Sequence, residues 1–70
     1  MPDQLPIELE EYIRERITGR IDDFHVERAD QCLVLQGKSR SFYAKQLAQV
    51  AAREFAPLAA LSNEICVIVS

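Results

Sequence analysis

The chain has 70 residues, of which 49% are apolar and 27% charged, so its composition is that of a single folded domain over residues 1–70. Eight basic and eleven acidic residues give a net charge of −3, which argues against a nucleic-acid partner. One histidine, two cysteines and two glycines cannot supply the usual catalytic or nucleotide-binding groups, so we expect neither enzyme activity nor a cofactor.

The first predicted element is a helix over residues 6–18. Pro6 suits a first helical turn, glutamates follow where the helix dipole favours negative charge, and arginines come near the end. An apolar stripe repeats every four residues at Leu9, Ile13 and Ile17.

A hairpin of two strands is predicted over residues 24–29 and 32–38, where apolar and polar residues alternate with a period of two. A two-residue turn at Asp30 and Gln31 brings apolar side chains opposite one another. A longer loop is the alternative, because Gln31 lacks the easy positive φ of glycine. The two-residue turn pairs Ala29 with Cys32, Glu27 with Val34, Val26 with Leu35 and His25 with Gln36.

A second helix is predicted over residues 41–55, with Ser39 or Ser41 as its cap. Pro57 ends it, because the residue before a proline avoids helical geometry. Its apolar face carries Ala44, Leu47, Ala48, Ala51 and Phe55. A third strand is predicted over residues 64–69, since this β-branched run is too short for a helix.

The element order predicts an α+β fold: a two-layer αββαβ sandwich in which both helices cover one face of a three-stranded mixed sheet. The third strand can lie beside the second or the first. If it lies beside the second, the two are parallel and joined by a right-handed crossover.

Two stretches resemble a known family. Residues 26–37, Val-Glu-Arg-Ala-Asp-Gln-Cys-Leu-Val-Leu-Gln-Gly, are similar to a hairpin pattern of alternating apolar residues around Asp-Gly, ending in glycine. Residues 57–67, Pro-Leu-Ala-Ala-Leu-Ser-Asn-Glu-Ile-Cys-Val, resemble the pattern Gly-Val-x-x-Val-x-Asn-x-Ile-x-Val. Over residues 9–69 the chain thus resembles the BON domain, a module of bacterial osmotically induced and nodulation-related proteins, although Gln31 and Pro57 stand where that family usually has glycine. The resemblance implies an αββαβ module, usually envelope-associated, that binds phospholipid surfaces or proteins and does not catalyse.

The segment that joins the second strand to the second helix is a candidate site for an anion or a lipid headgroup. Free backbone N–H groups, the helix dipole and several cations converge there. The candidate residues are Lys38, Ser39, Arg40, Ser41, Phe42 and Lys45. The alternative is an ordinary serine cap beside solvated cations, with Phe42 folded over the helix start or against a second subunit. A P-loop is excluded, because its first glycine would fall at Cys32.

The sheet face away from both helices is the candidate interface, with Cys32, Val34, Cys66 and Ile68. We expect it to be a contiguous apolar patch without cover from the chain itself, and such patches usually mark interfaces. The alternative is the half-exposed sheet face of a monomer.

The cysteines and the histidine match no metal or redox motif. Cys32 and Cys66 belong to no CxxC pair and are expected to remain thiols. His25 is expected on the surface opposite Gln36, and a zinc site that joined it to both cysteines would lack a fourth ligand.

The sequence opens without the basic and apolar segments of a signal peptide, so as written it reads as cytoplasmic, or as periplasmic or envelope-associated if it is cut from a longer exported protein. A domain this short buries only about 60% of its unfolded surface, which favours self-association. We therefore expect a non-catalytic module that binds a second copy or another protein through the open sheet face or an edge strand. The alternative is binding to anionic phospholipid through the basic start of the second helix.

Overall fold

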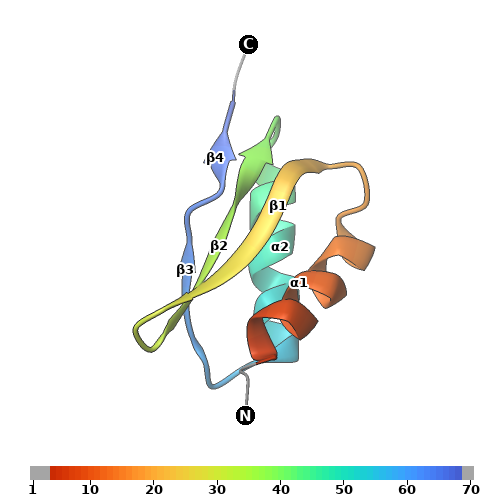
Figure 1. Ribbon diagram of the computed structural model, residues 1–70. Helices are drawn as coiled ribbons and strands as arrows, with labels where there is room; N and C mark the ends of the chain where they lie inside the picture. The colour runs from red at the N-terminus through yellow and green to blue at the C-terminus, as the bar shows by residue number, and fades with distance from the viewer. Residues whose placement is uncertain (1–3, 69–70) are drawn as a thin grey trace.

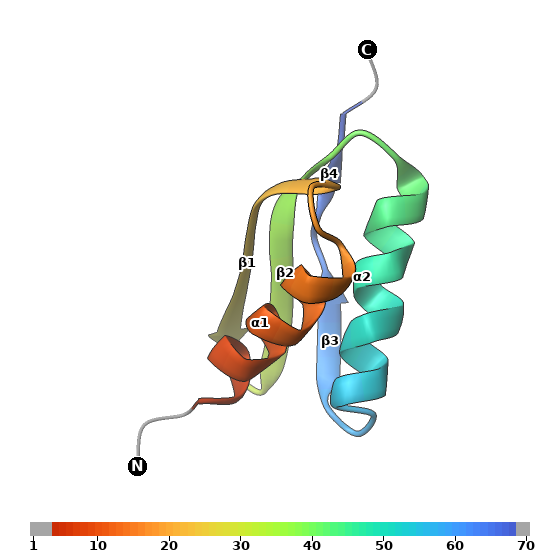
Figure 2. The ribbon, with the colours of Figure 1, turned by 90° about the vertical axis from the view of Figure 1, so that its right-hand side faces the viewer.

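The computed structural model describes residues 4–68 and has two helices on one face of a mixed sheet (Figure 1). In the view turned by 90°, α1 lies in front of the sheet and α2 runs alongside it (Figure 2). This confirms the predicted two-layer α+β fold. The elements are α1 (Leu5–Arg16), β1 (Ile21–Ala29), β2 (Cys32–Ser39), α2 (Phe42–Phe55), β3 (Ala60–Asn63) and β4 (Cys66–Val67).

β2 is the central strand of the sheet. β1 pairs with it antiparallel on one side, and β3 and β4 pair with it parallel on the other. The strand order that the sequence left open is therefore β1-β2-β3, with β4 continuing along the β3 side. α2 is the crossover between the parallel strands, as expected for neighbours of this kind.

α1 matches the predicted helix except at its ends, since it begins at Leu5 and finishes at Arg16. A proline stands in the first turn, and Ile17 is the C-terminal capping residue. The hydroxyl of Thr18 donates to the carbonyls of Arg14 and Glu15, which have no later helical N–H to accept from. The chain then turns into β1.

β1 begins three residues earlier than predicted, at Ile21. The register with β2 shifts between Asp22 and His25, and Asp23 takes a left-handed backbone with φ 54°. This bulge interrupts the alternation of apolar and polar residues, which is why the sequence pattern placed the start of the strand at Phe24. The bulge lets Ile21 and Phe24 both be buried.

The hairpin register is the predicted one. Ala29 pairs with Cys32, so the turn consists of Asp30 and Gln31 alone. Asp30 takes the positive φ of the turn, at 57°, which aspartate tolerates because its short side chain can bond to nearby backbone. The doubt about Gln31 is thus resolved by its neighbour.

Gly37 of β2 lies under the β1 bulge with a φ of 152°. A Cβ atom at this position would stand 2.8 Å from Cγ2 of Ile21 and 3.1 Å from the carbonyl oxygen of Asp22. The two strands can approach this closely only because residue 37 has no side chain.

α2 begins at Phe42, and Ser41 is its cap, because the Ser41 hydroxyl accepts a hydrogen bond from the N–H of Ala44 at 3.1 Å. Ser39 is buried and supports the cap: its hydroxyl accepts from the N–H of Ser41 and donates to the Ser41 carbonyl. Both serines that the sequence offered as caps therefore take part in the start of this helix.

The prediction of one strand over residues 64–69 is wrong. The chain pairs with β2 over Ala60–Asn63 and again over Cys66–Val67. Between these strands the N–H of Glu64 still donates to the Leu35 carbonyl of β2, but Glu64 and Ile65 belong to neither strand. The side chain of Asn63 makes the break: its Oδ1 accepts the N–H of Ile65, and its Nδ2 donates to the Lys45 carbonyl of α2. Val69 lies outside the described residues.

The core lies between the sheet and the helices. α1 contributes its predicted stripe, and the helix-facing side chains of β2 meet it. α2 presents alanines there, so that helix and sheet approach closely. The most deeply buried large residues are Leu9, Ile13, Leu33, Leu35 and Ile65.

Candidate functional site

The open face of the sheet holds all four predicted interface residues: Cys32, Val34, Cys66 and Ile68. Leu33 and Leu35 are buried against the helices, so their neighbours along β2 point to the other side. Ile65 is likewise buried against the helices, so the next residue, Cys66 of β4, points to the open face. The strand phase is therefore the one that the sequence predicts.

The apolar part of this face is smaller than expected. Val34 is only 8% exposed, because it lies on the central strand between Glu27 and Ser62 of the neighbouring strands. Ile68 is 48% exposed, but it follows β4 at the far end of β2. Polar side chains lie between the two ends, so the expected contiguous apolar patch is absent from the described part of this face.

The residues of the candidate anion site do gather at one end of the molecule, but they are not equally accessible. Ser39 is buried, and the hydroxyls of Ser39 and Ser41 bond to backbone groups of the helix start. Lys38 and Arg40 are exposed and remain available to a ligand, and Lys45 is half-buried. The serines are thus structural, and the cations make the surface.

Arg20 lies beside these cations, and the sequence analysis did not include it in the candidate site. It immediately precedes β1, whose antiparallel pairing brings its start beside the end of β2. Two shallow clefts of about 450 and 320 Å³ share Asp22 and Arg40, and Arg20 lines one of them while Lys38 lines the other. The hairpin register was the signal that could have placed Arg20 here.

Exposed aromatic rings border the cations. Phe42 is 66% exposed, with the Lys45 ammonium 5.9 Å from its ring centre. Tyr43 is also exposed, and the Arg20 guanidinium lies 5.6 Å from its ring. The Phe42 side chain is therefore not packed over the start of α2. We call Arg20, Lys38, Arg40, Phe42, Tyr43 and Lys45 the basic end.

The outer edge of β1 is closed by α1, a feature that the sequence analysis missed. Glu10 Oε1 accepts the N–H of Val26 at 2.9 Å, and Arg14 Nη2 donates to the carbonyl of Phe24 at 2.8 Å. Glu10 and Arg14 also pair with each other at 3.1 Å. These side chains occupy backbone groups that a further strand would need.

His25 lies at the same edge, between two carboxylates. Its Nδ1 is 3.0 Å from Oε1 of Glu10, and its Nε2 is 3.1 Å from Oε1 of Glu27. It pairs with Gln36 in the ladder, as expected. His25 thus ties the hairpin to α1.

The opposite edge, formed by β3 and β4, has no such cover among the described residues. Figure 1 shows these strands along the margin of the molecule, with α1 at the other side. The N–H of Glu64 donates to the carbonyl of Leu35 at 2.9 Å, so Glu64 and Ser62 direct their backbone groups toward β2. Leu61 and Asn63, which alternate with them, direct theirs outward.

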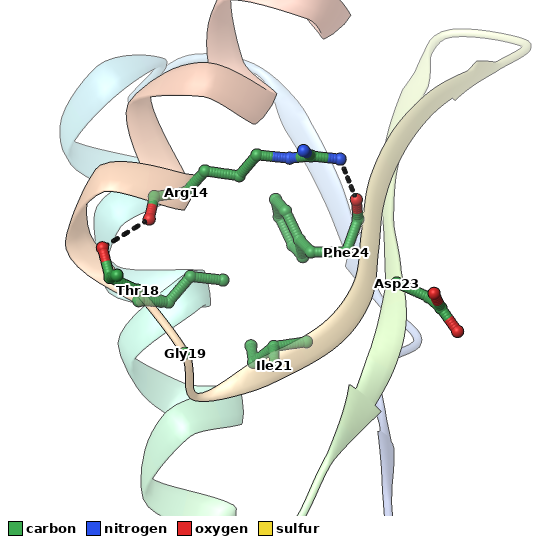
Figure 3. A pocket seen from close by; sticks show the side chains of 7 residues that line it. Arg14, Thr18, Gly19, Ile21, Asp23 and Phe24 are labelled. Atoms are coloured by element: carbon green, nitrogen blue, oxygen red, sulfur yellow. Dashed lines mark hydrogen bonds between the residues drawn. The ribbon is translucent and has the colours of Figure 1, made fainter.

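A further cleft, of about 440 Å³, lies between the end of α1 and the start of β1 (Figure 3). Arg14 reaches across it to the Phe24 carbonyl, Thr18 bonds back to Arg14, and Asp23 points away. Apart from Gly19, the remaining lining residues have apolar side chains, and the cleft brings no nucleophile beside a base.

Residues 4–68 contain no cluster of three side chains suited to bind a metal ion. Cys32 and Cys66 are free thiols, the first half-buried and the second exposed. Neither helix is long and apolar enough to span a bilayer.

Comparisons with protein-family models, with curated proteins and with solved structures found no match to this chain.

Proposed function

We propose that the chain is a non-catalytic interaction module that associates with a second copy, or with another protein, through its sheet. The observation that carries the proposal is the contrast between the two edges: α1 closes β1, whereas β3 presents outward backbone groups without a partner in residues 4–68. An uncovered strand edge is a template for another chain. The small size of the domain adds to this, since association buries surface that the monomer leaves exposed.

We infer in addition that the module is BON-like. The observed order of elements supports this, because it is the αββαβ order that the resemblance implies, with the last strand divided into β3 and β4. A non-catalytic role is supported by the position of the one histidine, whose two ring nitrogens are both held by carboxylates, those of Glu10 and Glu27.

The mass of the chain in solution tests association. Sedimentation velocity at micromolar to millimolar concentrations is expected to give a mass near twice the 8.0 kDa of one chain. Ile68→Asp places a charge on an exposed part of the open face, beyond the end of β4, so it separates contact through the face from contact through the β3 edge. A monomer throughout this concentration range contradicts the proposal.

Binding to an anionic phospholipid surface is the second candidate, and the basic end favours it. Exposed Phe42 and Tyr43 beside four basic residues match the apolar and polar layers of a membrane interface. The rest of the chain is acidic overall, so this end would face the lipid.

Sedimentation with vesicles tests the lipid proposal. The wild-type chain is expected to pellet with vesicles containing phosphatidylglycerol at low salt and to stay in solution with neutral vesicles. Arg40→Gln combined with Phe42→Ala should abolish pelleting, whereas Arg53→Gln, which removes a cation elsewhere on α2, should preserve it. No pelleting of wild type at low salt removes this candidate.

A further inference from the structure

We propose that the partner at the β3 edge is a second copy of this chain, related by a two-fold axis that passes beside Ser62, so that the sheets of the two copies become one continuous sheet. The inference rests on the proposed function and adds to it the strand, the register and the helix face that meet.

The backbone of β3 suits pairing with itself. Leu61 and Asn63 both direct N–H and C=O groups outward, because the intervening residues bond to β2. In an antiparallel pair centred on Ser62, Leu61 faces the partner's Asn63, and the reverse pair forms by symmetry. Each pair exchanges two hydrogen bonds, so all four outward groups of both residues are satisfied in each copy.

The side chains of this register carry no like charges opposite one another. Ser62 faces its own copy, and Ala60 faces the partner's Glu64, so the one charged residue meets a methyl group. The kink at Glu64 and Ile65 limits the pairing to β3, because the outward N–H of Ile65 already donates to Asn63 Oδ1. A longer edge pairing that could propagate into fibres is thereby disfavoured.

α2 supplies the second part of the contact. It lies over β2 and β3, where Asn63 Nδ2 donates both to the Lys45 carbonyl and, at 3.2 Å, to Oε1 of Gln49. A two-fold axis half a strand spacing beyond β3 therefore brings the copies of α2 side by side, and packed helices lie about 8–10 Å apart.

The surface of α2 on this side fits a copy of itself. A groove of about 290 Å³ is lined by Gln46, Gln49, Val50 and Arg53, and Val50 is 55% exposed. The antiparallel arrangement places Gln49 close to the partner's Gln49 and Arg53 close to the partner's Gln46. Neutral amides thus meet each other or an arginine, and the exposed valine gains cover.

Charge variants at Gln49 test the arrangement, because a residue beside a two-fold axis meets its own copy. Gln49→Lys and Gln49→Glu should each weaken self-association about tenfold or more, through like-charge repulsion. An equimolar mixture of the two should restore the dimer. Gln31→Lys and Gln31→Glu, in the exposed hairpin turn, are the matched controls and should associate as wild type does.

The outcomes separate this inference from the proposed function. A dimer that is unaffected by both Gln49 charges, or that only Ile68→Asp disperses, overturns the β3 arrangement and leaves association standing. A wild-type monomer at every concentration overturns both. Weakening by Gln49→Lys alone, without recovery in the mixture, points to the lost Asn63 contact and also overturns the two-fold arrangement.

Discussion

Single residues decide where this small sheet bends. Gly37 and Asp23 face each other across the first two strands, one without a side chain and the other in a left-handed backbone. β1 and β2 approach each other closely at Gly37, and the basic end lies just beyond this point. The position of the cations therefore depends on a glycine that is not itself part of the basic end.

Replacing Gly37 with alanine should lower the free energy of unfolding by about 3 kcal/mol, because it adds backbone strain to a steric clash. The added methyl group would stand 2.8 Å from Ile21 Cγ2. Gly19→Ala is the matched control: its φ is +74°, but nothing lies within 4 Å of the new methyl group, so it should cost only about 1 kcal/mol. Urea unfolding measures both, and equal losses at the two positions contradict the close approach of the strands.

The same scale shows what the sequence could not predict. The hairpin register followed from matching apolar side chains, and β1 and β2 have it. The break at Asn63 did not follow, because it depends on a side chain that bonds to α2, 18 residues earlier in the chain. Three consecutive polar residues, Ser62, Asn63 and Glu64, interrupt the apolar alternation here, so the pattern indicated neither the pairing of β3 nor its continuation in β4.

At the scale of elements, α1 acts as a cover for a strand edge as well as part of the core. The sequence predicted its buried stripe, since that stripe has helical periodicity. The role of Glu10 was not predictable, because glutamates near a helix start are usually solvated, and only the packing angle of α1 brings this one to the N–H of Val26. The sequence predicted correctly which strand residues point to the open face. It overestimated the exposed apolar area of that face, since neighbouring strands cover Val34.

Glu10→Ala should lower the free energy of unfolding by about 1–2 kcal/mol, because Glu10 accepts from a backbone N–H and pairs with Arg14. It should also open the β1 edge, so that larger species form at concentrations where wild type stops at the dimer. The control is Glu11→Ala, an exposed glutamate on the same helix. If Glu10→Ala matches this control in both stability and mass, α1 does not protect the edge.

At the scale of the whole molecule, the chain is asymmetric in charge and in its edges. Arg20, Lys38, Arg40 and Lys45 are half of the chain's eight basic residues, and they gather at one end although the net charge is −3. One side of the sheet is closed by a helix, and the other is bare among residues 4–68. A dimer built on the bare edge would leave both basic ends exposed, so association and lipid binding are compatible.

The exchange of backbone amide hydrogens at Leu61 and Asn63, followed by NMR at several protein concentrations, tests the completed sheet most directly. Both amides point away from β2, so only a neighbouring chain can protect them. Their exchange should slow as concentration rises, while Val26, whose N–H is held by Glu10 within the chain, stays unchanged apart from global stability. Fast exchange at both residues in every sample, including concentrated ones, contradicts the account.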